Sequence, residues 1–237
     1  MRSGQVNTST HFLSLQSDRS ASDMQNQPGR ASYLSKNYNI FMGLLVGGGL
    51  AFVGALVAGL ATGIVPSQSL VTVAAIVAIV ITYPMKLLPG KKALKSIPGV
   101  KLILIGACFF LTVVLAAQVG GAEIGSNVMK LALALGFYTA SSANLCDIPD
   151  LEGDRAEGIT TLAVLLGAKG AWVLSVALTI AGALMLFSMS SAGAAVTGAI
   201  WIALAMTWTP EATPLSSLLK LRKFGWLTFS VPVLLLG

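Results

Sequence analysis

Three aspartates near the middle of the chain, Asp147, Asp150 and Asp154, have the residue type and spacing of a cation site. Their i, i+3, i+7 spacing predicts one shared face of a helix that begins near Ile148, with Pro149 in its first turn. Converging carboxylate oxygens suit a hard cation such as Mg²⁺, which in turn suits a phosphate-bearing substrate. A solvated loop with acids at a helix start is the simpler alternative. The aspartates are therefore candidate metal ligands and candidate catalytic groups.

Basic residues precede the aspartates in the segment 84–101, which contains Lys86, Lys91, Lys92, Lys95 and Lys101. An ordinary basic loop on the inner side of a membrane explains part of this run. Lysine also serves as a point charge for phosphate, so the same loop fits a diphosphate-binding rim. Acids that hold a cation and lysines that hold phosphate on one side of a bundle would make a site for a metal–diphosphate.

The elements that must position these groups are membrane helices. The chain has 237 residues, of which 55% are hydrophobic and 10% charged, whereas a soluble domain has about 25% charged residues. Apolar runs measured against a span of about 20 residues predict about seven helices: 39–63, 69–88, 100–119, 128–146, 170–189, 193–208 and 224–237. They lack the alternation of a membrane β-barrel. We expect an all-α, polytopic transmembrane bundle.

The charges predict the topology of this bundle. If the N-terminus is inside, the inside segments are 1–38, 84–101, 147–169 and 209–223, and they hold every Lys and Arg except Lys130 and every acid except Glu123. This is a strong positive-inside bias. We expect a multi-pass protein in the lipid bilayer of a bacterial inner membrane or of a plastid or mitochondrion.

Two parts of the chain differ in composition. Residues 1–36 are polar and rich in Ser, Gln and Asn, and we expect them to be disordered, whereas 37–237 form the membrane domain. The remains of a truncated domain are an alternative for 1–36, and so is a transit peptide, which Asp18 and Asp23 weaken. The run 224–237 would span only about 21 Å as a helix, so we expect either a half-length helix or a chain that is a fragment.

Other chemistry finds little support in the sequence. Cys108 and Cys146 lie in separate apolar segments, where they fit small hydrophobic packing residues. His11 is the only histidine and lies in the polar tail, so a Ser-His-Asp mechanism is not expected. The net charge of +6 indicates topology and phosphate affinity, and no nucleic-acid partner is expected.

The acid segment resembles a known family. Asp147-Ile-Pro-Asp-Leu-Glu-Gly-Asp-Arg155 followed by Gly158-Ile-Thr-Thr-Leu162 is similar to the second aspartate-rich motif of the UbiA-type intramembrane prenyltransferases, most of all in their homogentisate and chlorophyll-synthase-like branches. Tyr83-Pro-Met-Lys86 and Ile97-Pro-Gly-Val-Lys101 resemble the family's loop between its fourth and fifth helices. The resemblance covers about residues 40–237.

The resemblance implies a helical bundle in which Mg²⁺ holds a polyprenyl diphosphate and a prenyl group passes to an aromatic or other lipophilic acceptor. The three aspartates would hold the metal. The residues implied for the diphosphate are Lys86, Lys101 and Arg155. The cavity groups implied are Tyr83 and Asn144.

The family's first motif, Asn-Asp-x-x-Asp-x-x-x-Asp, is not found in this chain, and about seven apolar segments stand where the family has nine. We therefore expect a truncated form of the family fold, which would bind diphosphate but transfer the prenyl group poorly. The alternatives are a degenerate member without turnover and a small multi-pass transporter. A transporter would be expected to carry ionisable residues in the middle of its helices.

Overall fold

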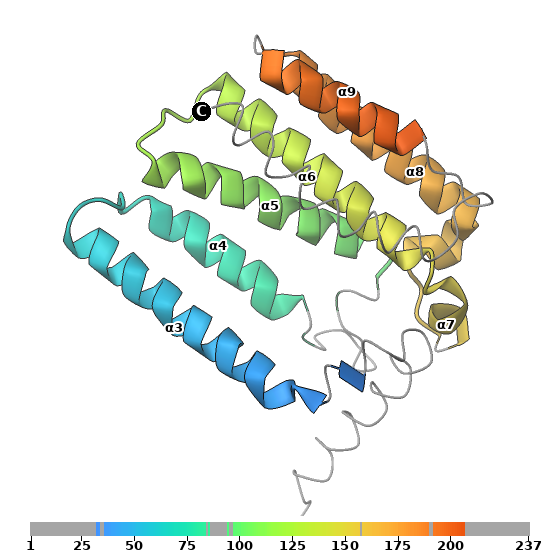
Figure 1. Cartoon of the computed structure of the whole chain (residues 1–237), viewed down its shortest axis with the longest axis horizontal. Helices are drawn as coiled ribbons and strands as arrows, with labels where there is room; N and C mark the ends of the chain where they lie inside the picture. The colour runs from blue at the N-terminus through green and yellow to red at the C-terminus, as the bar shows by residue number, and fades with distance from the viewer. Residues whose placement is uncertain are drawn as a thin grey trace, which may run out of the picture. The chain divides into compact units, whose positions relative to one another are not determined.

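The computed structural model describes residues 32–33, 36–83, 85, 94, 97–156, 158–189 and 192–206. These residues contain seven α-helices and no strand, which confirms the all-α prediction for this part of the chain. The helices are α3 Tyr38–Ala61, α4 Ser69–Thr82, α5 Val100–Val119, α6 Ser126–Asp147, α7 Leu151–Ala156, α8 Leu162–Phe187 and α9 Ala192–Met206 (Figure 1).

The chain divides into two compact units, Met1–Gly59 and Leu60–Gly237. Helix α3 belongs almost wholly to the first unit. It has 24 residues and contains Gly47, Gly48 and Gly49 in an otherwise apolar sequence. Its length exceeds the roughly 20 residues that a membrane span requires.

The helices of the second unit pack in a simple order. Helix α4 packs against α5, α5 against α6, and α6 against α8, and α8 also contacts α7 and α9. Figure 1 shows α4, α5, α6 and α8 lying side by side, with the short α7 beside the start of α8. Helix α6 is therefore the central element, and it carries the first aspartate at its C-terminal end.

Glycines let the central helices approach closely. A Cβ atom added to Gly106 of α5 would lie 2.9 Å from the carbonyl oxygen of Gly136 in α6, and one added to Gly136 would lie 3.0 Å from that of Gly106. A Cβ on Gly182 of α8 would meet the carbonyl oxygen of Ala134 at 2.9 Å. Small residues at such crossings are typical of membrane helices, because association there depends on close packing.

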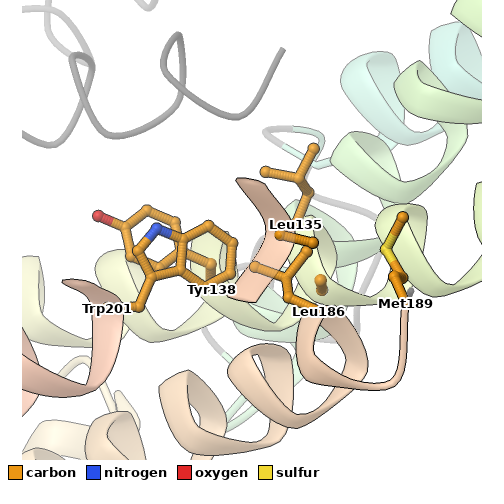
Figure 2. Packing of buried hydrophobic residues seen from close by; sticks show 7 residues of the cluster. Leu135, Tyr138, Leu186, Met189 and Trp201 are labelled. Atoms are coloured by element: carbon orange, nitrogen blue, oxygen red, sulfur yellow. The ribbon is translucent and has the colours of Figure 1, made fainter. Parts of the chain in front are cut away.

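The largest buried cluster joins α6, α8 and α9. Tyr138 of α6 stacks on Trp201 of α9, with ring centroids 4.2 Å apart and an interplanar angle of 18°. Figure 2 shows these rings together with the neighbouring side chains Leu135, Leu186 and Met189. Aromatic stacking of this kind adds to the apolar contacts that hold α9 on the bundle.

Three of the described helices are long and apolar enough to cross a membrane: α3, α5 and α8. Helices α4 and α9 are apolar but shorter, and the 14 residues of α4 span about 21 Å against a hydrocarbon core of about 30 Å. Helix α6 has 22 residues, about 33 Å, and is more polar because its buried face carries hydroxyl and amide side chains.

Several predicted boundaries were wrong. The segment predicted at 69–88 is helical only to Thr82; Pro84, two residues later, has no N–H with which to continue the helix. The segment predicted at 170–189 begins earlier, at Leu162, and has a kink at Gly167 with φ 71° and ψ 169°. The run 224–237 and the polar tail, apart from 32–33 and 36, lie outside the described residues.

Candidate functional site

The acid segment is a helix end, a turn and a second helix. Asp147 is the last residue of α6, residues 148–150 form a turn, and α7 begins at Leu151, so the prediction of one continuous helical face was wrong. Pro149 explains the break, because it has no N–H to donate to the carbonyl of Leu145. That carbonyl accepts instead from the N–H of Ile148 at 3.3 Å.

The turn still brings the aspartates near one another. The N–H of Asp154 donates to the carbonyl of Asp150 at 2.8 Å. Burial raises the pKa of the Asp154 carboxyl above its usual 3.8, and the negative charges of Asp147 and Asp150 raise it further. A hydrogen bond from the Thr161 hydroxyl and the charge of Lys101 act in the opposite direction. Asp147 and Asp150 therefore act electrostatically on Asp154, although the three do not share one helix.

The three aspartate side chains are not arranged as a metal site in this structure. Among the described residues, no group of three or more His, Cys, Asp or Glu side chains is arranged to hold a metal ion. Asp150 makes a further polar interaction of its own. The metal site therefore stays a prediction, and it requires the aspartate side chains to move closer together.

Lys101 forms an ion pair with Asp147. Lys101 lies in the first turn of α5, which follows Gly99 in the left-handed conformation (φ 80°). The Asp147 side chain is 6% exposed and that of Lys101 is 23% exposed. The second carboxylate oxygen of Asp147, Oδ2, is buried and has no hydrogen-bond partner within the described part of the chain. This pair joins the last residue of the predicted segment 84–101 to the first residue of 147–169.

Asn144 lies one turn before Asp147 and is fully buried. Its Nδ2 donates to the carbonyl of Ala171 at 2.6 Å and to Oγ of Ser175 at 2.8 Å. A carbonyl can only accept, so the amide orientation is fixed and Oδ1 must point elsewhere. Oδ1 has no partner among the residues that the structure describes. Within the described ranges, Asn144 and Asp147 thus each have one buried side-chain oxygen without a hydrogen-bond partner, on neighbouring turns of α6.

A polar seam continues deeper between α6 and α8. The hydroxyl of Ser141 donates to the carbonyl of Ser175 at 2.8 Å and lies 2.8 Å from the hydroxyl of Thr179. The Ser175 hydroxyl donates back to the carbonyl of Ser141 at 3.2 Å. These bonds fix the position of α8 against the helix that ends in Asp147.

The other predicted residues lie at different distances from the ion pair. The phenol of Tyr83 is within electrostatic reach of Lys101 and Asp147. Arg155 forms an exposed pair with Glu152 at 3.3 Å instead, so the structure does not bring it to the aspartates. Lys86 lies outside the described residues.

The sequence reasoning missed Thr161 and the hydroxyls of the polar seam. Thr161 caps α8 by accepting from the N–H of Val164 at 3.3 Å, while its hydroxyl bonds to Asp154. A threonine directly before an apolar helical run is a recognised cap signal, so Thr161 could have been found. The hydroxyls of the polar seam could not have been assigned partners without knowing how α6 and α8 pack.

Apolar helices long enough to cross a membrane, with carboxylates and a lysine at one end of the bundle, define the class as a helical membrane protein. The UbiA prenyltransferase family model matches residues 18–218, and the chain belongs to this family. It is an integral membrane protein.

One relative is the digeranylgeranylglyceryl phosphate synthase of Sulfolobus acidocaldarius, 34% identical over 111 residues, which cover 42% of this chain. The chain spans 40% of that relative's length. No solved structure gives a significant match. The predicted homogentisate and chlorophyll-synthase-like branches stay predictions.

Proposed function

We propose that this protein transfers a prenyl group from a polyprenyl diphosphate to a lipophilic acceptor within the membrane, with Mg²⁺ as cofactor. The observation that carries this proposal is the meeting of Asp147, Asp150, Asp154 and Lys101 at one end of the helix pair α5 and α6. The charges of Asp147 and Asp150 act on Asp154, and like charges repel one another unless a cation neutralises them.

The donor set fits Mg²⁺. Carboxylate oxygens are the protein ligands that Mg²⁺ takes when it also holds a substrate phosphate. Oδ2 of Asp147 is such a carboxylate oxygen: it is buried and has no hydrogen-bond partner among the described residues, so it is available as a metal ligand. Asp147, Asp150 and Asp154 would hold the metal, which would supply positive charge to the departing diphosphate.

The chain's own residues would do the remaining work. Lys101 would add a second positive charge for the diphosphate, in a partly buried setting where electrostatic stabilisation is stronger than in water. Tyr83, at the end of α4, and Asn144, in α6, would border the headgroup site. The apolar surfaces of the helices would receive the isoprenoid tail and exclude water from the reactive cation.

The acceptor follows from the resemblance and from the relative. The resemblance favours an aromatic ring, and the name of the Sulfolobus relative adds a glyceryl phosphate lipid as a second acceptor class to be tested. Both are lipophilic and reach the site from the membrane.

The test is a transfer assay with the full chain in lipid nanodiscs, labelled geranylgeranyl diphosphate and either acceptor. We expect prenyl transfer that depends on Mg²⁺ and is slow, because the family's first motif is not found in this chain. The rate should fall at least about tenfold further in Asp150→Asn, because a charged ligand is lost. Glu152→Gln is the matched control, since Glu152 is exposed and pairs with Arg155. Equal losses in both variants would contradict the site. Diphosphate binding without transfer would favour the degenerate-member alternative.

A further inference from the structure

The ion pair between Lys101 and Asp147 places a positive charge where the proposed function requires a metal. The Asp147 side chain is 6% exposed, and a charged carboxylate at that depth is stabilised by a nearby cation. The side chain that provides this charge is Lys101. We propose that Lys101 is a positioning residue that stands in for the metal at Asp147 and moves to the diphosphate when the metal–diphosphate binds. The inference rests on the proposed function of this site.

Geometry supports an exchange of partners. Lys101 has a flexible four-carbon stem and lies in the first turn of α5, and its side chain is 23% exposed. Its ammonium group can therefore reach the solvent at this end of α5. Asp147 has a shorter side chain, and only 6% of it is exposed. The lysine is therefore the partner that moves, and the carboxylate is the fixed point.

Charge makes the exchange selective. A divalent cation and an ammonium group that share one carboxylate repel each other. A metal ion that binds Asp147 alone must therefore displace Lys101 into solvent, where Lys101 has no new anionic partner. A diphosphate that arrives with the metal offers Lys101 new oxygen acceptors. The metal and the diphosphate should therefore strengthen each other's binding, and the coupling must be reciprocal.

A consequence follows for the order of events. While the diphosphate is absent, Lys101 keeps Asp147 neutralised, and the site has low affinity for free divalent cations. When the metal and the diphosphate are both bound, Lys101 would gain phosphate oxygens as acceptors, and Asp147, Asp150 and Asp154 would be the residues that hold the metal.

The test measures Mn²⁺ binding to the full chain in detergent by electron paramagnetic resonance, without any prenyl substrate. We expect Lys101→Met to bind Mn²⁺ alone at least about tenfold more tightly than the unmodified chain, because the competing charge is gone. Lys101→Gln is a second neutral variant should the methionine variant not fold. Lys101→Arg should behave like the unmodified chain.

Two controls locate the effect. Lys130→Met removes a lysine near the other end of α6, where it donates to the carbonyl of Ser188 at 2.8 Å, and should leave Mn²⁺ affinity unchanged. Adding Asp147→Asn to Lys101→Met should abolish the gain. Unchanged or weaker Mn²⁺ binding in both neutral variants, or a gain that survives Asp147→Asn, would overturn the inference.

The same apparatus separates this inference from the proposed function. If the unmodified chain does not bind Mn²⁺ together with geranylgeranyl diphosphate, the proposed function fails. If it binds both and the neutral variants show no gain for Mn²⁺ alone, only the role of Lys101 fails.

Discussion

Replacing Asn144 with alanine should weaken ligand binding far more than its effect on stability explains. Asn144 makes two hydrogen bonds from α6 to α8, at 2.6 and 2.8 Å, and its Oδ1 is buried and unpaired within the described residues. Oδ1 could therefore accept a hydrogen bond from a ligand, as could Oδ2 of Asp147, which likewise has no partner in the part of the chain that the structure describes.

Ser141→Ala is the matched control, because Ser141 also makes two side-chain hydrogen bonds from α6 to α8, both at 2.8 Å. Interhelical hydrogen bonds in membranes average about 0.6 kcal/mol, so each variant should lose about 1.2 kcal/mol of unfolding free energy. Only Asn144→Ala also removes an acceptor for the ligand. A neutral hydrogen bond contributes about 0.5–1.5 kcal/mol, which corresponds to a roughly 2- to 13-fold increase in Kd.

Two assays on the same preparations decide the matter. Titration with sodium dodecyl sulfate, followed by circular dichroism, gives the unfolding free energy of each variant in mixed micelles. Equilibrium dialysis with labelled geranylgeranyl diphosphate and Mg²⁺ gives Kd. If both variants weaken binding equally, or if neither does, Asn144 is only a packing residue and the reasoning about Oδ1 is refuted.

Three further predictions follow from packing, charge and topology. Gly136→Val should lower the unfolding free energy by at least about 1 kcal/mol in the detergent titration, because its Cβ would lie 3.0 Å from the carbonyl oxygen of Gly106; an unchanged midpoint would contradict the close crossing. The pKa of Asp154 is raised above 3.8, so its contribution to the unfolding free energy is present below pH 3.8 and is lost as the pH rises through the raised pKa. Asp154→Asn should therefore flatten the pH dependence of the unfolding free energy measured without metal, and an unaltered pH profile would contradict this role of Asp154. Cysteines placed at Glu123 and Glu152, both exposed, should be labelled from opposite sides of the membrane, and labelling from one side would overturn the topology.

The sequence by itself determined the class of the protein. Apolar runs of about 20 residues predict helices, because only helices satisfy every backbone group within one segment inside a bilayer. The aspartate-rich string from Asp147 to Asp154 was sufficient to indicate the family that the family model then matched over residues 18–218. Both inferences depend on neighbours along the chain, and a sequence contains that information directly.

Only the tertiary structure decided which groups meet. Pro149 interrupts the helix that the aspartate spacing predicted. Lys101 of α5 pairs with Asp147 of α6, although the two residues are 46 positions apart in the sequence. The partners of Asn144 depend on the register of α6 against α8, and that register depends on close glycine crossings such as Gly182 with Ala134. Spacing along one helix fixes which side chains share a face, whereas contacts between helices depend on packing that no single segment specifies.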